Sequence, residues 1–357
     1  MKSLIYTLED VKKSSDRKLF KVVSLFAGGG GSSTGYKLAG GDVLAINEFV
    51  PAAQKAYYTN YPDTYIFKQD VRSLTGRRIL IKIGLEKGEL DVLDGSPPCS
   101  SFSMAGSREK GWGKTKKYSD TVQRTDDLFF EFSRILKEVQ PKVFICENVA
   151  GLAYGGASSL LGNAQHSIFN NDDLTIYHSL VNAGYSVRYK IINARHFGVP
   201  QHRERLIFIG VRNDIQMKIT YPERLYPFVS LSDAFVDLHN SENDLSECDI
   251  TKHKVYERLC LLKEGETYEK GFLSKAHRNK VGATVTASAG NIGGRCSHHW
   301  ENRKFTVKET IRICSFPDDY YLGDTYSNKI ERLGRAIPPL MMKAVASHVY
   351  ETILSKI

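Results

Sequence analysis

The segment Leu93–Gly113, LDGSPPCSSFSMAGSREKGWG, carries the residue of this chain best suited to nucleophilic chemistry. Cys99 follows a short apolar run that is typical of a buried strand, and Pro97 and Pro98 fix the backbone immediately before it. A thiol has a pKa of about 8.5 and needs positive or polar surroundings to act as a thiolate. We therefore interpret Cys99 as a nucleophile that a rigid loop holds in a defined direction, rather than as a structural cysteine within a strand, such as Cys146.

Charged side chains that could act with a thiolate lie near the ends of two later apolar segments. Glu147 ends the segment 142–147, and a carboxylate beside a thiolate would raise the cysteine pKa, so its expected role is in proton transfer. Arg203 and Arg205 stand at alternate positions that lead into the segment 205–211, so both can point to one side of a strand. These two guanidinium groups could supply the positive field that a thiolate needs.

A glycine-rich turn follows the first apolar segment and predicts a ligand cradle. Residues 28–31 are all glycine, which permits a tight turn, and a helix expected from Ser32 offers free N–H groups. Glu48 and Asp70 follow the next two apolar segments, where carboxylates could accept hydrogen bonds from ribose hydroxyls and an adenine amino group. Dinucleotide and nucleoside cofactors both use such turns. The alternative is a structural glycine turn with solvated loop carboxylates.

These residues are expected at one edge of a sheet. Short apolar segments alternate with helical ones, a pattern typical of an α/β fold with a doubly wound, Rossmann-like, mostly parallel sheet. Seven segments are expected as strands: 20–26, 42–46, 64–67, 90–94, 142–147, 185–193 and 205–211. Apolar residues from Val122 to Val139 recur mostly at three- and four-residue steps and predict a helix packed on the sheet. Open parallel sheets bind ligands at the carboxyl ends of their strands, where Cys99, Glu147 and the glycine turn would meet.

The regular pattern is interrupted once. Residues 222–304 form short, mixed segments rich in charge, whereas residues 305–357 return to helical periodicity. We therefore expect a catalytic and cofactor-binding domain over residues 1–221, a smaller irregular domain over 222–304, and a C-terminal segment that rejoins the first domain. We find no internal repeat in the sequence.

Composition narrows the class of protein. The chain has 357 residues, of which 41% are hydrophobic, without an apolar run that approaches the roughly 20 residues needed to cross a bilayer. Glu9 and Asp10 stand where a signal peptide would need an apolar stretch. The six cysteines show no CxxC pair and no metal-ligand spacing, so we expect reduced thiols, no metal and a cytoplasmic location. The net charge of +9 favours a polyanionic partner.

The motifs resemble those of the cytosine-5 DNA methyltransferases and occur in the order found in that family. FAGGGGSSTG is similar to the S-adenosylmethionine loop, GSPPCSSFSMAG to the nucleophile loop, and ENV to the base-reading glutamate. QHRER is similar to the QxRxR element, and GRAIPP to a C-terminal segment that completes the cofactor site. The resemblance covers nearly the whole chain.

The resemblance implies a mechanism. Cys99 would add to carbon 6 of a cytosine, while Glu147 would bind ring nitrogen 3 and the exocyclic amine as charge develops. Arg205 would reach the ring oxygen at position 2, and Arg203 would order the loop around the thiolate. Carbon 5 would then take the alkyl group, and a base would remove its proton. Because this chemistry cannot occur inside a stacked duplex, the target base must be flipped out.

The resemblance also assigns binding residues. Those for the cofactor, S-adenosylmethionine, are Phe26, Gly28, Gly30, Glu48, Phe49, Asp70, Pro97 and Arg335. Those for double-stranded DNA are Ser100, Ser103, Arg108, Lys110 and Arg295. The basic loop after Cys99 is expected to close over the DNA from the minor-groove side, and the alternative is a solvated basic turn. Residues 222–304 correspond to the target-recognition domain, in which His298, His299 and Trp300 are either recognition residues or ordinary packing.

Four positions depart from the family pattern. Ser24 stands where aspartate is usual, Ser96 replaces a glycine, and Ser100 replaces a glutamine. Arg335 stands where the family nearly always has asparagine, in a segment over the reactive end of the cofactor. It could turn toward a DNA phosphate or the methionine carboxylate. The alternative is a donor with an extra carboxylate, carboxy-S-adenosylmethionine, which Arg335 would bind and from which the enzyme would form 5-carboxymethylcytosine.

The sequence therefore predicts a DNA (cytosine-5)-methyltransferase of the restriction-modification type. We expect a monomer that could act beside a separate restriction endonuclease. Two other classes are disfavoured. The complete set of Cys99, Glu147, Arg203 and Arg205 argues against a non-catalytic DNA binder. The cysteine-phenylalanine-threonine element that marks the tRNA-modifying branch of the family is not found, which argues against an enzyme acting on RNA.

Overall fold

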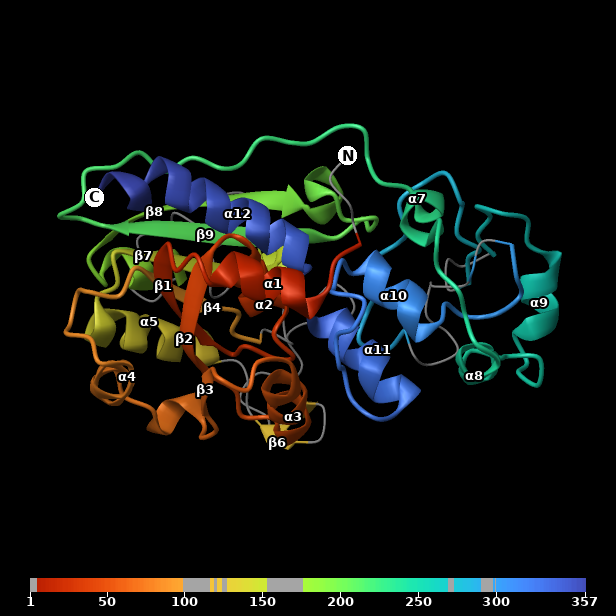
Figure 1. The fold of residues 1–357 in the computed structure, drawn as a ribbon, viewed down its shortest axis with the longest axis horizontal. Helices are drawn as coiled ribbons and strands as arrows, with labels where there is room; N and C mark the ends of the chain where they lie inside the picture. The colour runs from red at the N-terminus through yellow and green to blue at the C-terminus, as the bar shows by residue number, and fades with distance from the viewer. Residues whose placement is uncertain are drawn as a thin grey trace.

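The computed structural model describes residues 5–98, 116–118, 121–123, 127–152, 176–268, 273–289, 298 and 300–357. Its centre is a seven-stranded sheet with the strand order β3-β2-β1-β4-β7-β9-β8 (Figure 1). The strands are β1 Phe20–Leu25, β2 Gly41–Asn47, β3 Tyr65–Phe67, β4 Val92–Gly95, β7 Val143–Val149, β8 Tyr185–Asn193 and β9 Glu204–Arg212. Each segment expected as a strand is a strand of this sheet, and the predicted α/β fold is confirmed.

The first strand lies where the order of strands reverses. β1 pairs in parallel with both β2 and β4, so the chain continues to one side of β1 and later to the other. In open α/β sheets a ligand crevice forms at such a point, outside the carboxyl ends of the two strands. The glycine-rich turn follows β1, and the segment that leads to Cys99 follows β4. The topology therefore directs both segments to the same crevice.

One long strand runs against the direction of its neighbours. β9 pairs antiparallel with both β7 and β8, whereas the five strands from β3 to β7 pair in parallel. In an antiparallel pair the start of one strand lies beside the end of the other. Arg205, near the start of β9, is therefore opposite Val149 at the end of β7. This register brings the arginine to the edge of the sheet where β4 and β7 end.

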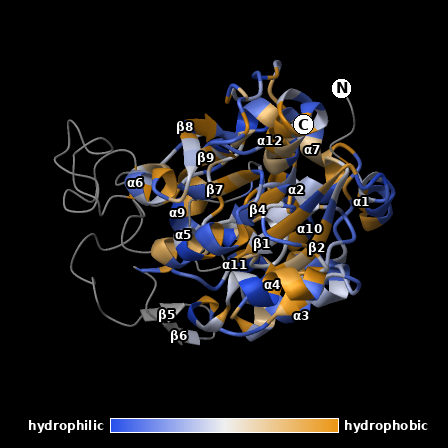
Figure 2. Cartoon of the chain, turned by 90° about the vertical axis from the view of Figure 1, so that its left-hand side faces the viewer, coloured by the Kyte–Doolittle hydropathy of each residue, from blue (hydrophilic) through white to orange (hydrophobic). Residues whose placement is uncertain are grey.

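Helices cover both faces of the sheet. One face carries α1 Leu8–Ser15, α2 Gly31–Leu38 and α12 Pro339–Thr352, and the other carries α4 Gly76–Ile83, α5 Leu128–Val139 and α6 Ile176–Val181. The other α-helices of the described chain are α3 Pro51–Asn60, α7 Leu231–Phe235, α8 Glu242–Glu247, α9 Tyr256–Leu261, α10 Val307–Ile313 and α11 Tyr326–Arg335. Figure 2 shows hydrophilic and hydrophobic residues together on α1 and α5, as expected of helices with one face on a core. Within the described ranges, no helix has the length and apolar character needed to cross a membrane.

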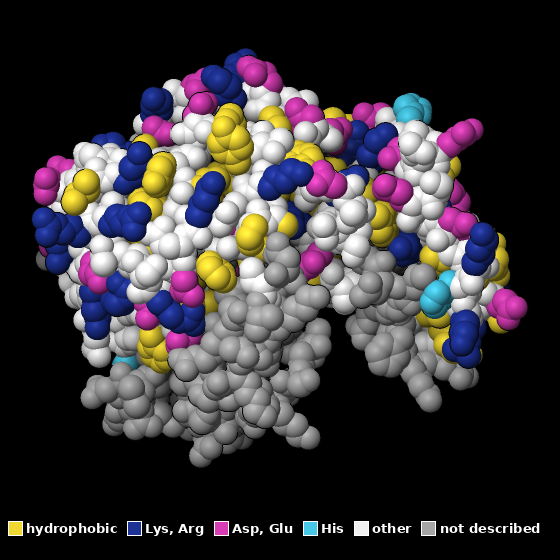
Figure 3. Space-filling view, turned by 90° about the horizontal axis from the view of Figure 1, so that it is seen from below, with side chains coloured by type: hydrophobic (Ala, Val, Ile, Leu, Met, Phe, Trp, Pro, Cys, Tyr) yellow, Lys and Arg dark blue, Asp and Glu magenta, His cyan; other side chains and the backbone are white. Residues whose placement is uncertain are grey.

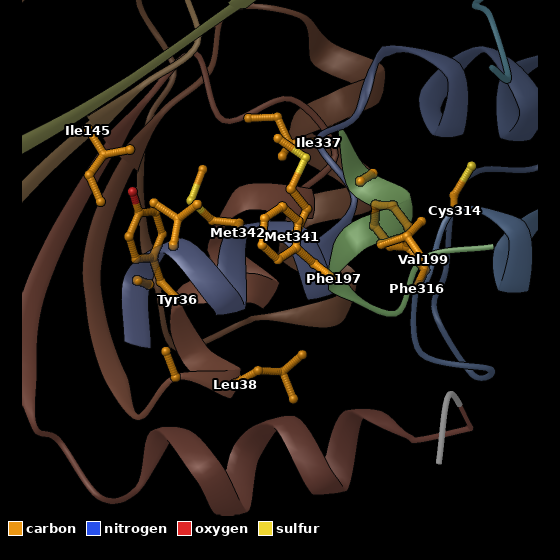
Figure 4. Packing of buried hydrophobic residues seen from close by; sticks show 14 of the residues in the cluster. Tyr36, Leu38, Ile145, Phe197, Val199, Cys314, Phe316, Ile337, Met341 and Met342 are labelled. Carbon is orange, nitrogen blue, oxygen red and sulfur yellow. The ribbon is translucent and has the colours of Figure 1, made fainter. Parts of the chain in front are cut away.

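α2 and α12 approach closely because a glycine stands at their contact. A Cβ atom on Gly35 would lie 2.6 Å from the Cβ atom of Met342, so a larger residue would push the helices apart. Met341 and Met342 of α12 pack with Tyr36 of α2 in one cluster (Figure 4), and all three side chains are fully buried. This contact holds α2 in place, and the first turn of α2 faces the crevice.

The helix expected to include Val122 begins later. α5 starts at Leu128, and Val122 lies in a separate two-stranded ribbon, in which β5 Lys116–Tyr118 pairs antiparallel with β6 Thr121–Gln123. The expectation was wrong at this residue because valine is also favoured in strands, and one apolar residue does not define a helical period. From Leu128 onward the helical spacing is real, and the apolar side of α5 is buried.

Residues 222–304 lie to one side of the sheet. Their described part holds α7, α8 and α9 and none of the sheet strands. α10 and α11 lie between this part and the sheet (Figure 1), and α10 packs on α7. Figure 3 shows positively and negatively charged side chains interspersed over the described surface seen from below. The chain thus leaves the sheet after β9 and returns to it through α10, α11 and α12.

Met342→Ala tests the contact of α2 with α12. Removal of this fully buried side chain leaves a cavity that its neighbours fill only in part, so the free energy of unfolding should fall by about 2–5 kcal/mol. Ile81→Ala, at a residue of α4 that is 70% exposed, is the control and should change it by no more than about 0.5 kcal/mol. Chemical denaturation followed by circular dichroism measures both values. Equal losses for the two variants would contradict the packing described.

Candidate active site

Glu147 and Arg205 form a buried ion pair at the end of β7. The Nε atom of Arg205 donates to Oε1 of Glu147 across 2.7 Å, and the two side chains are only 14% and 10% exposed. The Nη1 atom of Arg205 also donates to the backbone oxygen of Glu204, at 2.7 Å. Hydrogen bonds between ionised groups are short and strong. The pair therefore holds the Glu147 carboxyl group in one orientation at the edge of the crevice.

Burial and charge act on Glu147 in opposite directions. Burial raises the pKa of its carboxyl group, while the positive charges of Arg205 and Arg203, and then the hydroxyl of Ser96, lower it. Burial has the larger effect, so the pKa of Glu147 lies above its ordinary value. Such a carboxyl group is better suited than an exposed glutamate to share a proton with a bound base.

Arg203 lies near this pair but binds different groups. It is 1% exposed, and its Nη1 and Nη2 atoms donate to the carbonyl oxygens of Val285 and Gly334 at 2.8 and 2.9 Å. The side chain of Gln201 supports the same contact, since its Oε1 atom accepts from the N–H of Val285. Arg203 thus joins the start of β9 to the residues 222–304 and to α11. The sequence did not suggest this structural role.

The segment that leads to the proposed nucleophile is anchored before it reaches Cys99. Asn148, the middle residue of ENV, donates from Nδ2 to the carbonyl oxygen of Pro97 at 3.4 Å, which ties the end of β7 to the segment after β4. The sequence did not single out Asn148, because its residue type alone does not distinguish an anchor from a solvated polar residue. Outside the described residues lie the nucleophile and the expected DNA contacts, Cys99, Ser100, Ser103, Arg108, Lys110 and Arg295.

The turn after β1 has the backbone conformations that glycine makes accessible. Gly28 and Gly30 have φ angles of +56° and +97°, and Phe26 has a φ angle of +57°. Among the described residues nothing lies within 4 Å of a Cβ atom built on Gly28, so a ligand can approach the backbone there. On Gly30 such an atom would collide with the hydroxyl of Tyr320, which donates to the carbonyl oxygen of Gly29 at 2.5 Å.

Glu48 fixes this turn from the end of β2. Its Oε2 and Oε1 atoms accept hydrogen bonds from the N–H groups of Gly28 and Val50, each at 2.7 Å. Burial raises the pKa of Glu48, and these N–H groups oppose the rise. Because each carboxylate oxygen can accept more than one hydrogen bond, Glu48 can hold the turn and still accept from ribose hydroxyls.

The first turn of α2 completes the cradle. The hydroxyls of Ser32 and Ser33 are buried, near the carboxyl group of Asp94 and the hydroxyl of Tyr57 respectively, but neither forms a hydrogen bond of good geometry with another described residue. Buried polar atoms without partners are unfavourable, and the start of a helix presents free N–H groups, so a ligand with carboxylate or hydroxyl groups would satisfy both. The residues present therefore fit the binding of S-adenosylmethionine, which carries such groups.

The expected residues for the adenine lie at the neighbouring strand ends. Asp70 caps the turn after β3, and both of its carboxylate oxygens accept from Arg72, at 2.9 Å. Phe49 follows β2 and is 38% exposed, which leaves its ring accessible. Asp70 thus has a fixed orientation, and Phe49 has free surface for a planar ligand.

The C-terminal segment GRAIPP lies against the glycine turn. A Cβ atom on Gly31 would collide with the carbonyl oxygen of Ile337 and would lie 3.2 Å from the Cβ atom of Ala336. Arg335, one residue earlier, is the last residue of α11, and its Nε atom donates to Glu331 at 2.8 Å. The segment therefore contacts the cradle, while the guanidinium of Arg335, about a third exposed, has a carboxylate of its own helix as a partner.

A buried carboxyl group that the sequence did not single out lies beside the cradle. Asp94 is 1% exposed, and it accepts hydrogen bonds from the hydroxyls of Ser24 at 2.5 Å and Tyr36 at 3.0 Å. Ser24 and Asp94 are opposite each other in the pairing of β1 with β4. The resemblance leads one to expect a carboxylate at position 24 of β1. In this protein a carboxyl group is instead at the facing position of β4, in Asp94.

The residues considered for DNA recognition differ in exposure. His298 is 2% exposed, packs against Phe305 and has its Nε2 atom 3.6 Å from Glu309, which favours the packing interpretation. Burial lowers the pKa of His298 to about 3, so the ring is neutral. Trp300 is 47% exposed, with the guanidinium of Arg278 4.6 Å from its ring centre. His299 lies outside the described residues.

Comparison with solved structures defines the class. A prophage-encoded DNA modification methyltransferase of E. coli matches with a TM-score of 0.71 at 20% identity, over 93% of this chain and 99% of that one. The DNMT2 of Spodoptera frugiperda matches with a TM-score of 0.67 at 16% identity, over 94% and 99% of the two chains. The fold is that of a class I methyltransferase.

Comparison of sequences defines the family. The chain is 32% identical to the Type II methyltransferase M1.HphI of Haemophilus parahaemolyticus, over 92% of this chain and 86% of that protein. It is 30% identical to M.Eco47II of Escherichia coli, over 93% and 79%. Residues 20–351 match the C-5 cytosine-specific DNA methylase family, and the chain belongs to that family. The class of enzyme predicted from the motifs, a DNA (cytosine-5)-methyltransferase, is confirmed.

Gly334→Ala tests the contact of α11 with residues 222–304. A Cβ atom there would collide with the backbone of Thr286, and such overpacking costs about 1–3 kcal/mol, more than the helix gains from alanine. We expect a lower melting temperature and weaker binding of S-adenosylmethionine, because α11 leads into the segment that contacts Gly31. Calorimetry measures both.

Ser327→Ala, at an exposed position of the same helix, is the control and should change the stability by no more than about 0.5 kcal/mol. If Gly334→Ala matched this control in both melting temperature and affinity, the close contact of α11 with Thr286 would be contradicted.

Proposed function

We propose that this protein transfers a methyl group from S-adenosylmethionine to carbon 5 of a cytosine that is flipped out of duplex DNA. The observation that carries the proposal is the buried pair of Glu147 and Arg205. It lies at the end of β7, tied through Asn148 to the segment that leads to Cys99. The glycine cradle of β1 opens on the same edge of the sheet.

The chemistry begins with the cysteine. Carbon 5 of cytosine is too weak a nucleophile to attack a sulfonium directly, so the thiolate of Cys99 adds to carbon 6 and converts the ring to an enamine. Carbon 5 would then take the methyl group as the bond from that group to the sulfonium sulfur breaks, which leaves the neutral thioether. A base removes the proton from carbon 5, the bond from sulfur to carbon 6 breaks, and the thiolate leaves with restoration of the ring.

Glu147 and Arg205 act on the pyrimidine during addition. Glu147 holds ring nitrogen 3 and the exocyclic amine, and its raised pKa favours sharing a proton with nitrogen 3 as negative charge develops. Arg205 donates to the ring oxygen at position 2. Because these groups are fixed to one another before the base arrives, little reorganisation is needed at the moment of reaction.

The cofactor site uses the residues of the cradle. The backbone at Gly28 is open to the methionine part of the cofactor, and we assign Gly30 and Pro97 to the same part. Glu48 would bind the ribose, and Asp70 with Phe26 and Phe49 would bind the adenine. When bound, S-adenosylmethionine supplies an electrophilic methyl group. The hydroxyls of Ser32 and Ser33 gain partners from its polar groups.

DNA would bind between the sheet and the residues 222–304, which lie to one side of it (Figure 1). Basic residues outnumber acidic ones between Lys270 and Lys304, which favours phosphate contacts, and we assign target recognition to residues 222–304. The basic loop after Cys99, with Ser100, Ser103, Arg108 and Lys110, would close on the flipped base, and Arg295 would contact the DNA. We expect a monomeric, cytoplasmic enzyme, which could act beside a separate restriction endonuclease as part of a restriction-modification system.

Cys99→Ser should abolish methyl transfer and leave cofactor affinity within about threefold of the parent. A hydroxyl has a similar size but is far less nucleophilic at neutral pH. Transfer of tritium from labelled S-adenosylmethionine to duplex DNA measures activity, and calorimetry measures affinity. More than a few per cent of residual transfer would rule out Cys99 as the nucleophile, and transfer by the parent to tRNA in preference to duplex DNA would overturn the assigned substrate.

A second candidate reaction is carboxymethyl transfer from carboxy-S-adenosylmethionine. The observation that favours it is the place of Arg335, directly before the two residues that contact Gly31. The pairing of Arg335 with Glu331 opposes it, because the guanidinium would have to leave that carboxylate to bind another.

An assay in which S-adenosylmethionine and carboxy-S-adenosylmethionine compete, followed by mass spectrometry of the nucleosides, distinguishes methyl from carboxymethyl transfer. We expect the parent and Arg335→Asn to form 5-methylcytosine with the same donor preference. Formation of 5-carboxymethylcytosine by the parent, lost in Arg335→Asn, would establish the second reaction instead.

A further inference from the structure

The buried carboxyl group of Asp94 has no role in the chemistry described above. It lies on β4 and accepts from Ser24 of β1 and Tyr36 of α2, so both of its oxygens are held by neutral hydroxyl groups. Both hydroxyls are completely buried. Three elements that form the cofactor crevice therefore converge on one carboxyl group.

The charge of this group is not compensated within the described structure. No ion pair joins Asp94 to a lysine, arginine or histidine among the described residues, and the titratable groups near it are Glu147 of β7, Tyr36 of α2 and Tyr57 of α3. None of these carries positive charge. Burial raises the pKa of Asp94 to about 7, against the effect of the hydroxyls and with a further rise from Glu147.

The surroundings of Asp94 place it between the cradle and the candidate base-binding group. Tyr57 has its ring 3.2 Å from a Cβ atom built on Gly30, and it is also close enough to feel the charge of Asp94. Glu147 is close enough to raise the pKa of Asp94 from the other side. In the proposed function, the donor bound in the cradle must meet the base at Glu147. The reactive, positively charged end of the donor thus has to come to the neighbourhood of Asp94.

We propose that Asp94 is a positioning residue whose carboxylate, held by Ser24 and Tyr36, favours the cationic sulfonium donor over its neutral product. The inference rests on the proposed function. Methyl transfer converts the sulfonium to the thioether of S-adenosylhomocysteine, so the attraction to Asp94 is present before the reaction and absent after it. The carboxylate therefore favours donor binding and product release.

Asp94→Asn, which keeps the shape and removes the charge, tests the inference. Isothermal titration at pH 8, where Asp94 is ionised, measures the affinities for S-adenosylmethionine and S-adenosylhomocysteine. We expect the preference for S-adenosylmethionine over S-adenosylhomocysteine to fall roughly tenfold. This is the effect of removing a charge several ångströms from the sulfonium in a medium of intermediate dielectric constant. Affinity for the thioether should stay within about threefold. In steady state the KM for the donor should rise without a fall in kcat, because the lost interaction stabilises the bound donor at least as much as the transition state.

Tyr36→Phe is the matched control, because it removes a hydrogen bond to Asp94 without removing charge. Because that hydrogen bond lowers the pKa of Asp94, its loss should shift the preference for the sulfonium to higher pH without abolishing it. The exchange variant Ser24→Asp/Asp94→Ser retains one carboxyl and one hydroxyl in the facing positions of β1 and β4, and it should keep the parent's preference within about threefold.

The inference is overturned if Asp94→Asn weakens both ligands equally or neither. It is also overturned if the exchange variant, folded by its melting curve, loses the preference. If either result is obtained while the parent protein methylates DNA normally, the proposed function is unaffected. If the parent binds neither ligand and transfers no methyl group, the proposed function fails and the inference fails with it.

Discussion

The candidate site depends on the antiparallel pairing of β9 with β7 in a sheet that is otherwise mostly parallel. Were β9 parallel to β7, the start of the strand and Arg205 would lie at the opposite edge of the sheet, roughly 20 Å away. Glu147 would then be a buried carboxylate without its ion-pair partner, which is strongly unfavourable. The reversed direction of β9 thus places the positive charge of Arg205 beside Glu147, which offsets the cost of burying that carboxylate. It also sets the geometry in which a flipped base could be bound.

A second constraint is the return of the C-terminal chain. Arg203, two residues before Arg205, binds carbonyl oxygens of Val285 and Gly334, so the start of β9 is joined to the irregular part of the molecule and to α11. α11 leads into the segment that packs on Gly31, and α12 packs on α2. The cofactor cradle, the base-binding pair and the residues 222–304 therefore form one connected unit, and a displacement of α11 should affect all three.

The strands could be predicted from the sequence because they are short apolar segments bounded by turns, whereas their order and the reversed direction of β9 come from the structure. The boundary at Val122 was wrong because one β-branched residue fits either a helix or a strand. The candidate site was predicted in its residue types but not in its contacts. The partners of Arg203 are 82 and 131 positions away in the chain, and Glu147 is far from Arg205 in the sequence, so no local pattern reveals that the two arginines have different partners.

The pairing of Asp94 with Ser24 was missed for the same reason. It requires the register of β1 with β4, and within the sequence Asp94 is only a polar residue at the end of an apolar run. The sequence shows that serine replaces the usual aspartate at position 24, but it does not show that Asp94 supplies a carboxyl group at the facing position. The same holds for Asn148, whose contact with Pro97 joins two strand ends that are adjacent in space and separate in the chain.

The most direct test of the account is covalent trapping on duplex DNA in which the target cytosine is replaced by 5-fluorocytosine. Fluorine cannot leave as a proton does, so addition and methyl transfer should proceed and the final elimination should stop. The account predicts a stable complex in the presence of S-adenosylmethionine, with the methylated fluoropyrimidine attached to Cys99 in the peptide mass spectrum. Attachment to another residue, or methylation of normal duplex DNA without a trapped complex, would contradict it.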